Sequence, residues 1–226
     1  MVLENNYKIE EFDPEILREY DIRGIVDKNI TENTAYTIGR IFAYVVFDKL
    51  KSNNIVLGYD GRLTSPKLHK ALSVGLRDSG ANVINIGMCP TPMLYFADYY
   101  LKTDAALMIT GSHNPSEYNG FKMVLNKHSF FSDNIQNFQS IVNKIKLEKK
   151  EGSIKSVNII DNYIERILKN ISIKNKMKIS WDIGNGAMGV VIKDLISKLK
   201  NTDNIILNKE VDGNFPNHHP DPTVPK

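Results

Sequence analysis

A single hydroxyl nucleophile lies in a tight turn directly after a short apolar run of the sequence. Residues 110–115 read Thr-Gly-Ser-His-Asn-Pro, and they follow the run Ala-Ala-Leu-Met-Ile at 105–109. Gly111 allows backbone angles that other residues avoid, and Pro115 prevents a helix from starting beneath the turn. Such a turn presents Ser112 at the mouth of a buried strand, where enzymes place nucleophiles. The same residue types also form ordinary turns, so the hexapeptide alone leaves a structural interpretation open.

Strand and helix patterns alternate along the part of the chain that contains this turn. Short apolar runs predict strands at 55–59, 83–86, 105–109 and 121–125. Apolar residues at helical spacing predict helices near 34–51, 68–76, 93–101 and 135–145. Alternating elements of this kind favour a three-layer α/β/α fold with a mixed, mostly parallel sheet. Because ligands bind beyond the carboxyl ends of such strands, we expect Asp60, Thr91 and Ser112 on one rim.

A polar segment is expected to divide the chain into two units. Residues 149–153 read Lys-Lys-Glu-Gly-Ser, which predicts a first domain over 1–152 and a second over 153–226. The second unit has helical patterns at 160–168 and 190–199, and clear strand patterns only at 178–183 and 204–207. Two strands are too few for an independent sheet. We therefore expect an incomplete domain of similar type, which is a fragment or one piece of a split protein.

Composition limits the classes of function. With 226 residues and a 42% hydrophobic fraction, the chain suits a globular protein of one or two domains. A formal net charge of +3 gives no reason to expect nucleic acid or membrane binding. Cys89 is the single cysteine, so no intrachain disulfide forms, and the first ten residues lack the features of a signal peptide. No apolar run approaches the ~20 residues of a membrane helix, so a cytoplasmic protein is expected.

Several further segments contain more polar and glycine residues than folding requires. They read Arg-Glu-Tyr-Asp-Ile-Arg-Gly at 18–24, Gly-Tyr-Asp-Gly-Arg at 58–62, Cys-Pro-Thr-Pro at 89–92, Tyr-Asn-Gly-Phe-Lys at 118–122, Asp-Ile-Gly-Asn-Gly at 182–186 and Asp-Gly-Asn-Phe-Pro-Asn-His-His-Pro-Asp-Pro at 212–222. In order and spacing, these segments and the serine turn closely resemble the motifs of the α-D-phosphohexomutases, the phosphomannomutase/phosphoglucomutase family. The resemblance runs from about Ile16 to the last residue.

The resemblance implies a four-domain enzyme that converts hexose 6-phosphate to hexose 1-phosphate, with mannose or glucose as the sugar. Ser112 matches the family's phosphorylated serine, which passes its phosphoryl group to the sugar and takes back the other one through a hexose 1,6-bisphosphate. In the family a Mg²⁺ ion contacts that phosphate, so Ser112 would bind the metal through its phosphate. A seryl phosphate carries a charge of about −1.5 to −2 and needs cations nearby. Phosphoryl transfer itself depends on positioning and charge neutralisation.

Lys122 and His113 match two family residues near the reacting groups. Lys122 matches the proposed acid/base lysine, and its strand leaves the serine turn, so its ammonium group could return to the same cleft. The structural alternative is a solvated lysine, since most lysines are exposed. His113 matches the histidine next to the phosphoserine, where it could donate to a phosphate or titrate near neutrality. The alternative for His113 is a hydrogen-bonding surface residue.

Arg23 and Tyr20 match the arginine and tyrosine that the family places near the phosphoserine and the substrate. A guanidinium group suits phosphate oxygens, although a salt bridge from Arg23 to Asp21 is the structural alternative. Asn114 is expected to shape the turn and to lie among the substrate-binding residues.

The loop at 58–62 is expected to have a structural role. Asp60 and Arg62 lie in it, and we interpret both as structural rather than catalytic. The family commonly has arginine where this chain has Tyr59, which is a departure from its pattern in this loop.

Two patterns in the second unit suggest other chemistry. Residues 184–189 fit G-x-G-x-x-G between a strand and a helix, with Glu210 about 20 residues on, as in a nucleotide-binding dehydrogenase module. A Rossmann domain needs more parallel strands after this motif, so we expect the glycines to serve the turn and helix packing. His218 and His219 suggest a metal site, but adjacent residues of an extended chain point in opposite directions.

The resemblance also implies parts that this sequence does not contain. The family's Asp-x-Asp-x-Asp metal loop should follow Lys226, as should the sugar-recognition and phosphate-binding loops of later domains. We therefore expect the 226 residues alone to be inactive or nearly so. A separately encoded C-terminal half is one possible partner, and a non-catalytic remnant is the alternative function.

Overall fold

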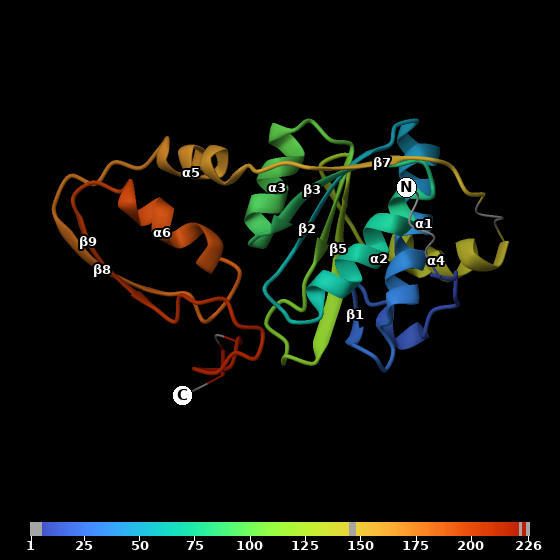
Figure 1. Ribbon diagram of the computed structural model, residues 1–226, viewed down its shortest axis with the longest axis horizontal. Helices are drawn as coiled ribbons and strands as arrows, with labels where there is room; N and C mark the ends of the chain where they lie inside the picture. The colour runs from blue at the N-terminus through green and yellow to red at the C-terminus, as the bar shows by residue number, and fades with distance from the viewer. Residues whose placement is uncertain (1–5, 145–147, 222, 225–226) are drawn as a thin grey trace.

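The computed structural model describes residues 6–144, 148–221 and 223–224. Ile145, which the helix pattern at 135–145 includes, and Pro222, which ends the motif at 212–222, lie outside these residues. A seven-stranded sheet forms the centre of the first unit (Figure 1). Its strands are β1 (Ile22–Ile25), β2 (Asn54–Tyr59), β3 (Asn82–Met88), β4 (Ala105–Ile109), β5 (Tyr118–Leu125), β6 (His128–Phe130) and β7 (Ser153–Ser156).

The sheet is mixed, and only one of its strands runs against the others. The order is β1-β5-β4-β2-β3-β7, with β6 also paired to β5. Strand β5 is antiparallel to β1, β4 and β6. The remaining pairs, β4 with β2, β2 with β3 and β3 with β7, are parallel. The expected mixed, mostly parallel sheet is confirmed.

Helices cover both faces of this sheet (Figure 1). One face packs against α1 (Glu32–Leu50), α2 (Ser65–Arg77) and α4 (Asp133–Lys144), and the other packs against α3 (Thr91–Tyr100). Strand alternation separates the two cores, because Ile55 and Leu57 of β2 lie in the first and Val56 lies in the second. Helix α1 begins with a capping box, in which the Thr31 and Thr34 hydroxyl groups accept each other's backbone N–H groups.

The second unit contains α5 (Ile160–Leu168), β8 (Met177–Asp182), α6 (Gly189–Ser197) and β9 (Thr202–Leu207). Strands β8 and β9 form a parallel two-stranded sheet. The unit extends from the α3 side of the first sheet as a separate lobe (Figure 1). Its buried residues Ile164, Val191 and Leu195 belong to the same core as Met93 and Leu94 of α3. The two expected strands and two expected helices are therefore present, and they share a core with the first unit.

Three strands and a short helix were not expected from the sequence. These are β1, β6, β7 and the 3-10 helix η1 (Pro14–Ile16). Strand β7 follows the boundary expected after residue 152, yet it pairs with β3, so the first sheet extends to Ser156. All four of its residues are exposed, so no apolar pattern marks it. The division at 152 itself stays a prediction.

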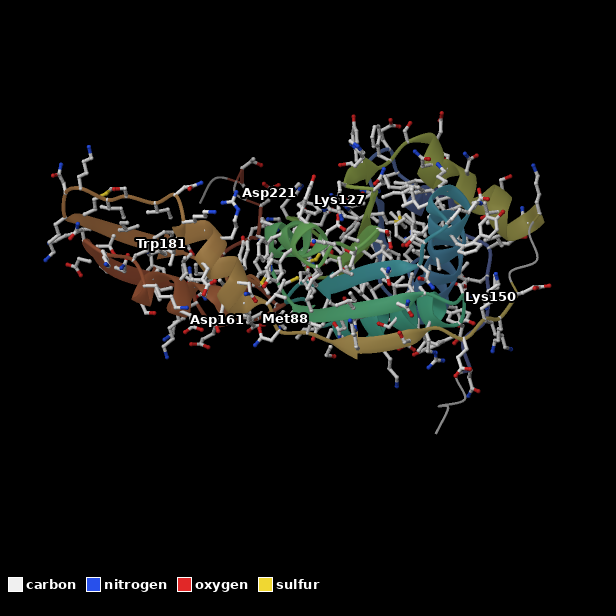
Figure 2. All side chains as sticks on the ribbon, turned by 90° about the horizontal axis from the view of Figure 1, so that it is seen from above. Met88, Lys127, Lys150, Asp161, Trp181 and Asp221 are labelled. Carbon is white, nitrogen blue, oxygen red and sulfur yellow. The ribbon has the colours of Figure 1, made fainter. Side chains whose placement is uncertain are left out.

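The direction of the parallel strands places their carboxyl ends beside the second unit. Figure 2 shows Met88, at the end of β3, toward the lobe that contains Trp181, whereas Lys150 lies at the opposite end of the sheet. Loops that follow β2, β3 and β4 therefore meet the second unit at one seam.

Candidate functional site

The loops that follow three parallel strands share one cavity at this seam. Asp60 after β2, Thr91 after β3 and Ser112 after β4 line a cavity of about 200 Å³. Ala187 and Met188, directly before α6, line its other side. The expected common rim is confirmed, because neighbouring parallel strands end at the same edge of the sheet.

Ser112 lies in the turn that follows a strand whose residues are all buried. Every residue of β4 is buried, whereas the Ser112 residue is exposed. Ser112 has a left-handed backbone with φ +54°, and its N–H donates to Thr110 Oγ1 at 2.9 Å. Its hydroxyl group makes no hydrogen bond to another described residue. The turn thus holds the serine backbone and leaves the hydroxyl group open to a reactant.

A cluster of two cations and one carboxylate lies beside this turn. Lys122 Nζ donates to Asp21 Oδ2 at 3.0 Å, and Arg23 forms an ion pair with the same oxygen. Arg23 Nη1 also donates to Asn114 Oδ1 at 3.4 Å, which joins the cluster to the Ser112 turn. The antiparallel pairing of β1 with β5 brings these residues together, since it sets Arg23 opposite Gly120 and Ile22 opposite Phe121.

The net charge of the cluster and one of its N–H groups suit the binding of an anion. Its formal charge is +1, from Lys122, Arg23 and Asp21, and their side chains are 28%, 13% and 6% exposed. The buried Nε of Arg23 has no hydrogen-bond partner among the described residues. A buried N–H group of a guanidinium without a partner is costly, and a phosphate oxygen is a strong acceptor for it.

Asp21 was expected only as a structural partner of Arg23, and the structure gives it a wider role. The Arg23–Asp21 salt bridge is present, and the same carboxylate also binds Lys122, which is 101 positions away. No local sequence signal predicts that second contact, because it depends on how β1 pairs with β5.

Tyr20 and His113 take no part in the polar contacts around Arg23 among the described residues. Tyr20 is 74% exposed, and no hydrogen bond or ring contact among the described residues joins it to Arg23 or Lys122. His113 is exposed, and its charge acts on Asp221 of the second unit. The pKa of Asp221 is lowered mainly by hydrogen bonds from Thr223, with smaller effects from His113 and His219.

Ser112 also lines a larger cavity of about 930 Å³ on the side of the second unit. Its other lining residues come from 182–186 and 215–221, together with Val224. His218 Nε2 lies 3.1 Å from Asp182 Oδ2 in this wall. The pKa of Asp182 is lowered, first by the hydrogen bond from Asn208, then by the backbone N–H of Gly184, and to a lesser extent by His218.

The two adjacent histidines contact different partners. His218 contacts Asp182, whereas His219 Nδ1 accepts the backbone N–H of Asp221 at 3.1 Å. Across residues 6–144, 148–221 and 223–224, no group of three or more His, Cys, Asp or Glu side chains is arranged to hold a metal ion.

The glycines of 184–189 are explained by the backbone and by packing. Gly184 has φ +57°, and a Cβ at Gly189 would lie 2.4 Å from the carbonyl oxygen of Lys209. Asn185, which is buried, donates to the carbonyl oxygen of Glu210 at 2.9 Å. Glu210, which would bind the ribose in a dinucleotide site, thus contacts the glycine loop through its backbone carbonyl group.

Comparisons with known proteins agree with this architecture. The family model "Phosphoglucomutase/phosphomannomutase, alpha/beta/alpha domain I" matches residues 14–150, and the model for domain II of the same family matches 161–226. A phosphomannomutase/phosphoglucomutase of Pseudomonas syringae pv. tomato is 44% identical over 209 residues, 92% of this chain and 44% of the relative. A phosphoglucomutase of Neisseria meningitidis serogroup B is 43% identical over 214 residues, 94% of this chain and 46% of the relative.

A solved structure also superposes on nearly the whole chain. It is a phosphoglucomutase/phosphomannomutase family protein from Burkholderia thailandensis, with a TM-score of 0.87 and 37% identity over 94% of this chain and 48% of that one. The chain spans less than half the length of the curated relatives named above. No helix among the described residues is both long and apolar enough to span a bilayer. With both family models in sequence order, these matches show that the chain belongs to the phosphoglucomutase/phosphomannomutase family.

Proposed function

We propose that this chain is the N-terminal part of a hexose phosphate mutase, which interconverts hexose 6-phosphate and hexose 1-phosphate with Ser112 as the phosphoryl carrier. The observation that carries this proposal is the placement of Ser112. Its exposed hydroxyl group lies between two cavities, next to a cationic cluster tied to its own turn. Membership of the family supports the same reaction and the same substrate class.

The proposed reaction moves one phosphoryl group in each half. In the first half the bond from phosphorus to Ser112 Oγ breaks, a bond from phosphorus to a sugar hydroxyl forms, and one proton passes from that hydroxyl to Oγ. The product is a hexose 1,6-bisphosphate. In the second half the bisphosphate, turned end for end, returns its other phosphoryl group to Oγ, and the proton moves back.

Lys122, Arg23, His113 and Asn114 have distinct parts in this proposal. The cationic cluster would neutralise the charge on the transferring group, which is the main requirement of phosphoryl transfer. The ammonium group of Lys122 is a donor of the proton that a departing sugar oxygen needs. His113, the next residue in the chain, would exchange the proton of Oγ, and Asn114 holds Arg23 against the turn at 3.4 Å. Tyr20, which is exposed, would contact substrate rather than the serine.

The residues present do not by themselves form a Mg²⁺ site. Mg²⁺ prefers oxygen ligands in octahedral geometry, and the groups next to the Ser112 turn are mainly cationic. Binding of the ion through a phosphate on Ser112 stays a proposal that requires further carboxylates, and no step above passes through the ion.

Mass spectrometry of the protein from its native cells tests the proposal first. Intact mass reports the length of the chain, and phosphopeptide mapping reports the state of Ser112. Phosphate on Ser112 in a chain longer than 226 residues supports a working mutase, and phosphate on a chain that ends at Lys226 supports a split enzyme with a second half. A bare serine, in samples handled to preserve phosphate, contradicts the proposal and favours a non-catalytic remnant.

Enzyme assays of the 226-residue chain provide the second test. The purified chain is expected to show almost no turnover with a hexose phosphate, a hexose bisphosphate primer and Mg²⁺. Turnover comparable to that of the longer relatives would refute the expectation that further parts are required.

A further inference from the structure

The guanidinium group of Arg62 lies inside the Ser112 turn. Its Nη1 atom donates to the carbonyl oxygens of Pro115 at 2.6 Å and Tyr118 at 3.0 Å. Its Nη2 atom donates to the carbonyl oxygens of Ser112 at 3.0 Å and Asn114 at 2.6 Å. One buried side chain thus binds four carbonyl groups across the turn, where a backbone ladder is absent. Arg62 itself is only 2% exposed.

Asp60 fixes the other side of the same arrangement. One of its carboxylate oxygens accepts the backbone N–H of Gly111 at 3.1 Å and lies 3.4 Å from Arg62 Nε. The other accepts the backbone N–H of Arg62 at 3.1 Å and the hydroxyl group of Ser65 at 2.6 Å. The aspartate therefore holds both the arginine and the start of the turn to the loop after β2.

The guanidinium packs directly against Gly111 of the turn, where a larger residue would meet it. A Cβ built on Gly111 would lie 2.3 Å from Arg62 Nε and 2.4 Å from its Cζ. Ser112, the next residue, has φ +54°, a conformation that L residues rarely adopt without support. The bonds of Arg62 to the Ser112 and Asn114 carbonyl groups supply that support on both sides of His113.

The second unit closes over the outer face of the same guanidinium. The Phe215 ring centroid lies 5.2 Å from Arg62 Cζ, a cation–π contact. The chain before it packs tightly, since a Cβ on Gly213 would lie 2.6 Å from the Leu63 backbone nitrogen. Across the same contact, a Cβ on Gly61 would lie 2.3 Å from a methyl group of Val211. Arg62 is therefore held between the serine turn of the first unit and the 211–215 segment of the second.

We propose that Arg62 is a positioning residue that holds the Ser112 turn in its reactive shape, and that Phe215 of the second unit completes the site that holds Arg62. This inference rests on the proposed function, because Ser112 is the group that is positioned. It also makes the geometry of the serine depend on docking of the second unit. A purely structural arginine would instead affect folding and leave the chemistry of each folded molecule unchanged.

Arg62→Lys is the main test, in the protein expressed from its own gene. Lysine keeps the positive charge beside Asp60 but cannot span four carbonyl groups as the planar guanidinium does. We expect kcat to fall about 10- to 100-fold while KM for the hexose phosphate changes little, since a small misplacement of a reacting group has that effect. Hydrogen exchange at the backbone amides of 111–121 is expected to become faster.

Arg40→Lys is the matched control. Arg40 is also buried, and it donates to Ser79, Tyr36 and the carbonyl oxygen of Glu148. These partners are not part of the Ser112 turn. This variant should lower the melting temperature, with kcat per folded molecule and exchange at 111–121 unchanged. Phe215→Leu, which removes the ring and leaves the turn intact, should lower kcat in the same direction as Arg62→Lys but by less.

The outcomes separate the positioning role from the proposed function. The positioning role is overturned if Arg62→Lys has the wild-type kcat and the wild-type exchange rates at 111–121. It is overturned equally if Arg62→Lys only lowers the melting temperature, as Arg40→Lys is expected to do. If Arg62→Lys does not fold, Phe215→Leu decides by the same two measurements. If the wild-type protein, assayed together with its second half where the chain ends at Lys226, shows no mutase turnover, the proposed function fails. Exchange at 111–121 still decides whether Arg62 holds the turn.

Discussion

The first unit buries its central strand completely, whereas the second unit leaves both of its strands half exposed. All five residues of β4 are buried, but exposure alternates along β8 and β9. Ile205 and Leu207 of β9 are 59% and 46% exposed. Ser112, the proposed nucleophile, thus lies in the turn after a strand that packing holds on both faces. The half-exposed unit supplies walls of both cavities and the ring that covers Arg62.

This difference in burial indicates that the two units contribute to the candidate site in different ways. A reacting group needs to be held within a fraction of an ångström, and rigid strands hold it better than mobile loops do. The first unit meets that requirement through β4 and the Asp60–Arg62 pair. The second unit contributes contacts across the seam, so its effect on chemistry is expected to act through them.

The largest expected effect is on kcat, and it is tested by replacing one serine in each unit. Ser112→Ala removes the proposed phosphoryl carrier, so kcat should fall by at least about a thousandfold, as for loss of a nucleophile elsewhere. Ser180→Ala, at an exposed position of β8, should leave kcat unchanged. Steady-state assays and phosphopeptide mapping of the protein expressed from its own gene measure both. Retained turnover in Ser112→Ala would exclude the serine as the carrier.

The next prediction compares two leucines of the two sheets. Leu107→Ala in β4 creates a cavity in a fully buried core, which should lower the free energy of unfolding by about 2–5 kcal/mol. Leu207→Ala in β9 removes a side chain that is 46% exposed and should cost less than about 1 kcal/mol. Urea denaturation of each variant checks the pair. Equal losses would mean that the outer face of β9 is covered in solution.

A smaller effect is expected on the pH dependence of stability. It comes from Cys89, whose surrounding core includes residues of both units. Burial raises the pKa of its thiol from 9.0 to about 12. Above pH 9 the unfolded chain loses this proton and the folded chain keeps it, so stability falls as pH rises from about 9 to about 12. The slope from this group should approach about 1.4 kcal/mol per pH unit.

Cys89→Ala is the comparison for that slope. Chemical denaturation between pH 8 and 11 should show a shallower loss of stability in the variant than in the wild type. Identical slopes would indicate that water reaches the thiol, and hence that the second unit does not cover the seam in solution.

The smallest expected effect lies in the second unit alone. Asn208→Ala removes the hydrogen bond from Nδ2 to Asp182 Oδ1, so the pKa of Asp182 should rise toward its usual value. Since the folded pKa is lowered, the carboxylate stabilises the fold above its usual pKa, and this contribution is lost as pH falls through the folded value. NMR titration measures the shift. Asn201→Ala, which breaks a bond to the carbonyl oxygen of Ile173, should leave the pKa of Asp182 unchanged.

Much of the fold follows from local patterns. The strands expected at 105–109 and 204–207 correspond to β4 and β9, and the helix expected at 34–51 corresponds to α1 at 32–50. These segments are predictable because burial of one face or both imposes a repeat on their own sequence. The serine turn was likewise visible, because glycine and proline limit its backbone.

Other elements exist only through partners that are distant in sequence. Strand β1 pairs with β5 about 100 positions away, and exposed β7 pairs with β3 about 70 positions away. The sequence marked Arg23 and Lys122 as separate candidates and Asp21 only as the alternative partner of Arg23, and it offered no sign that Asp21 also binds Lys122. In the same way, Arg62 was expected to be structural, and its four carbonyl partners lie 50 to 56 positions further along the chain.

By itself, the sequence determined most of the strands and helices and marked Ser112 as the candidate nucleophile, because these depend on side chains within a few positions of one another. Only the tertiary structure decided how β1 pairs in the sheet, that Asp21 joins Lys122 to Arg23, and that Arg62 binds the carbonyl groups of the Ser112 turn. The physical reason is that an ion pair or a buried hydrogen bond requires two groups to meet in space. The residue pattern within either of the two segments does not predict that contact.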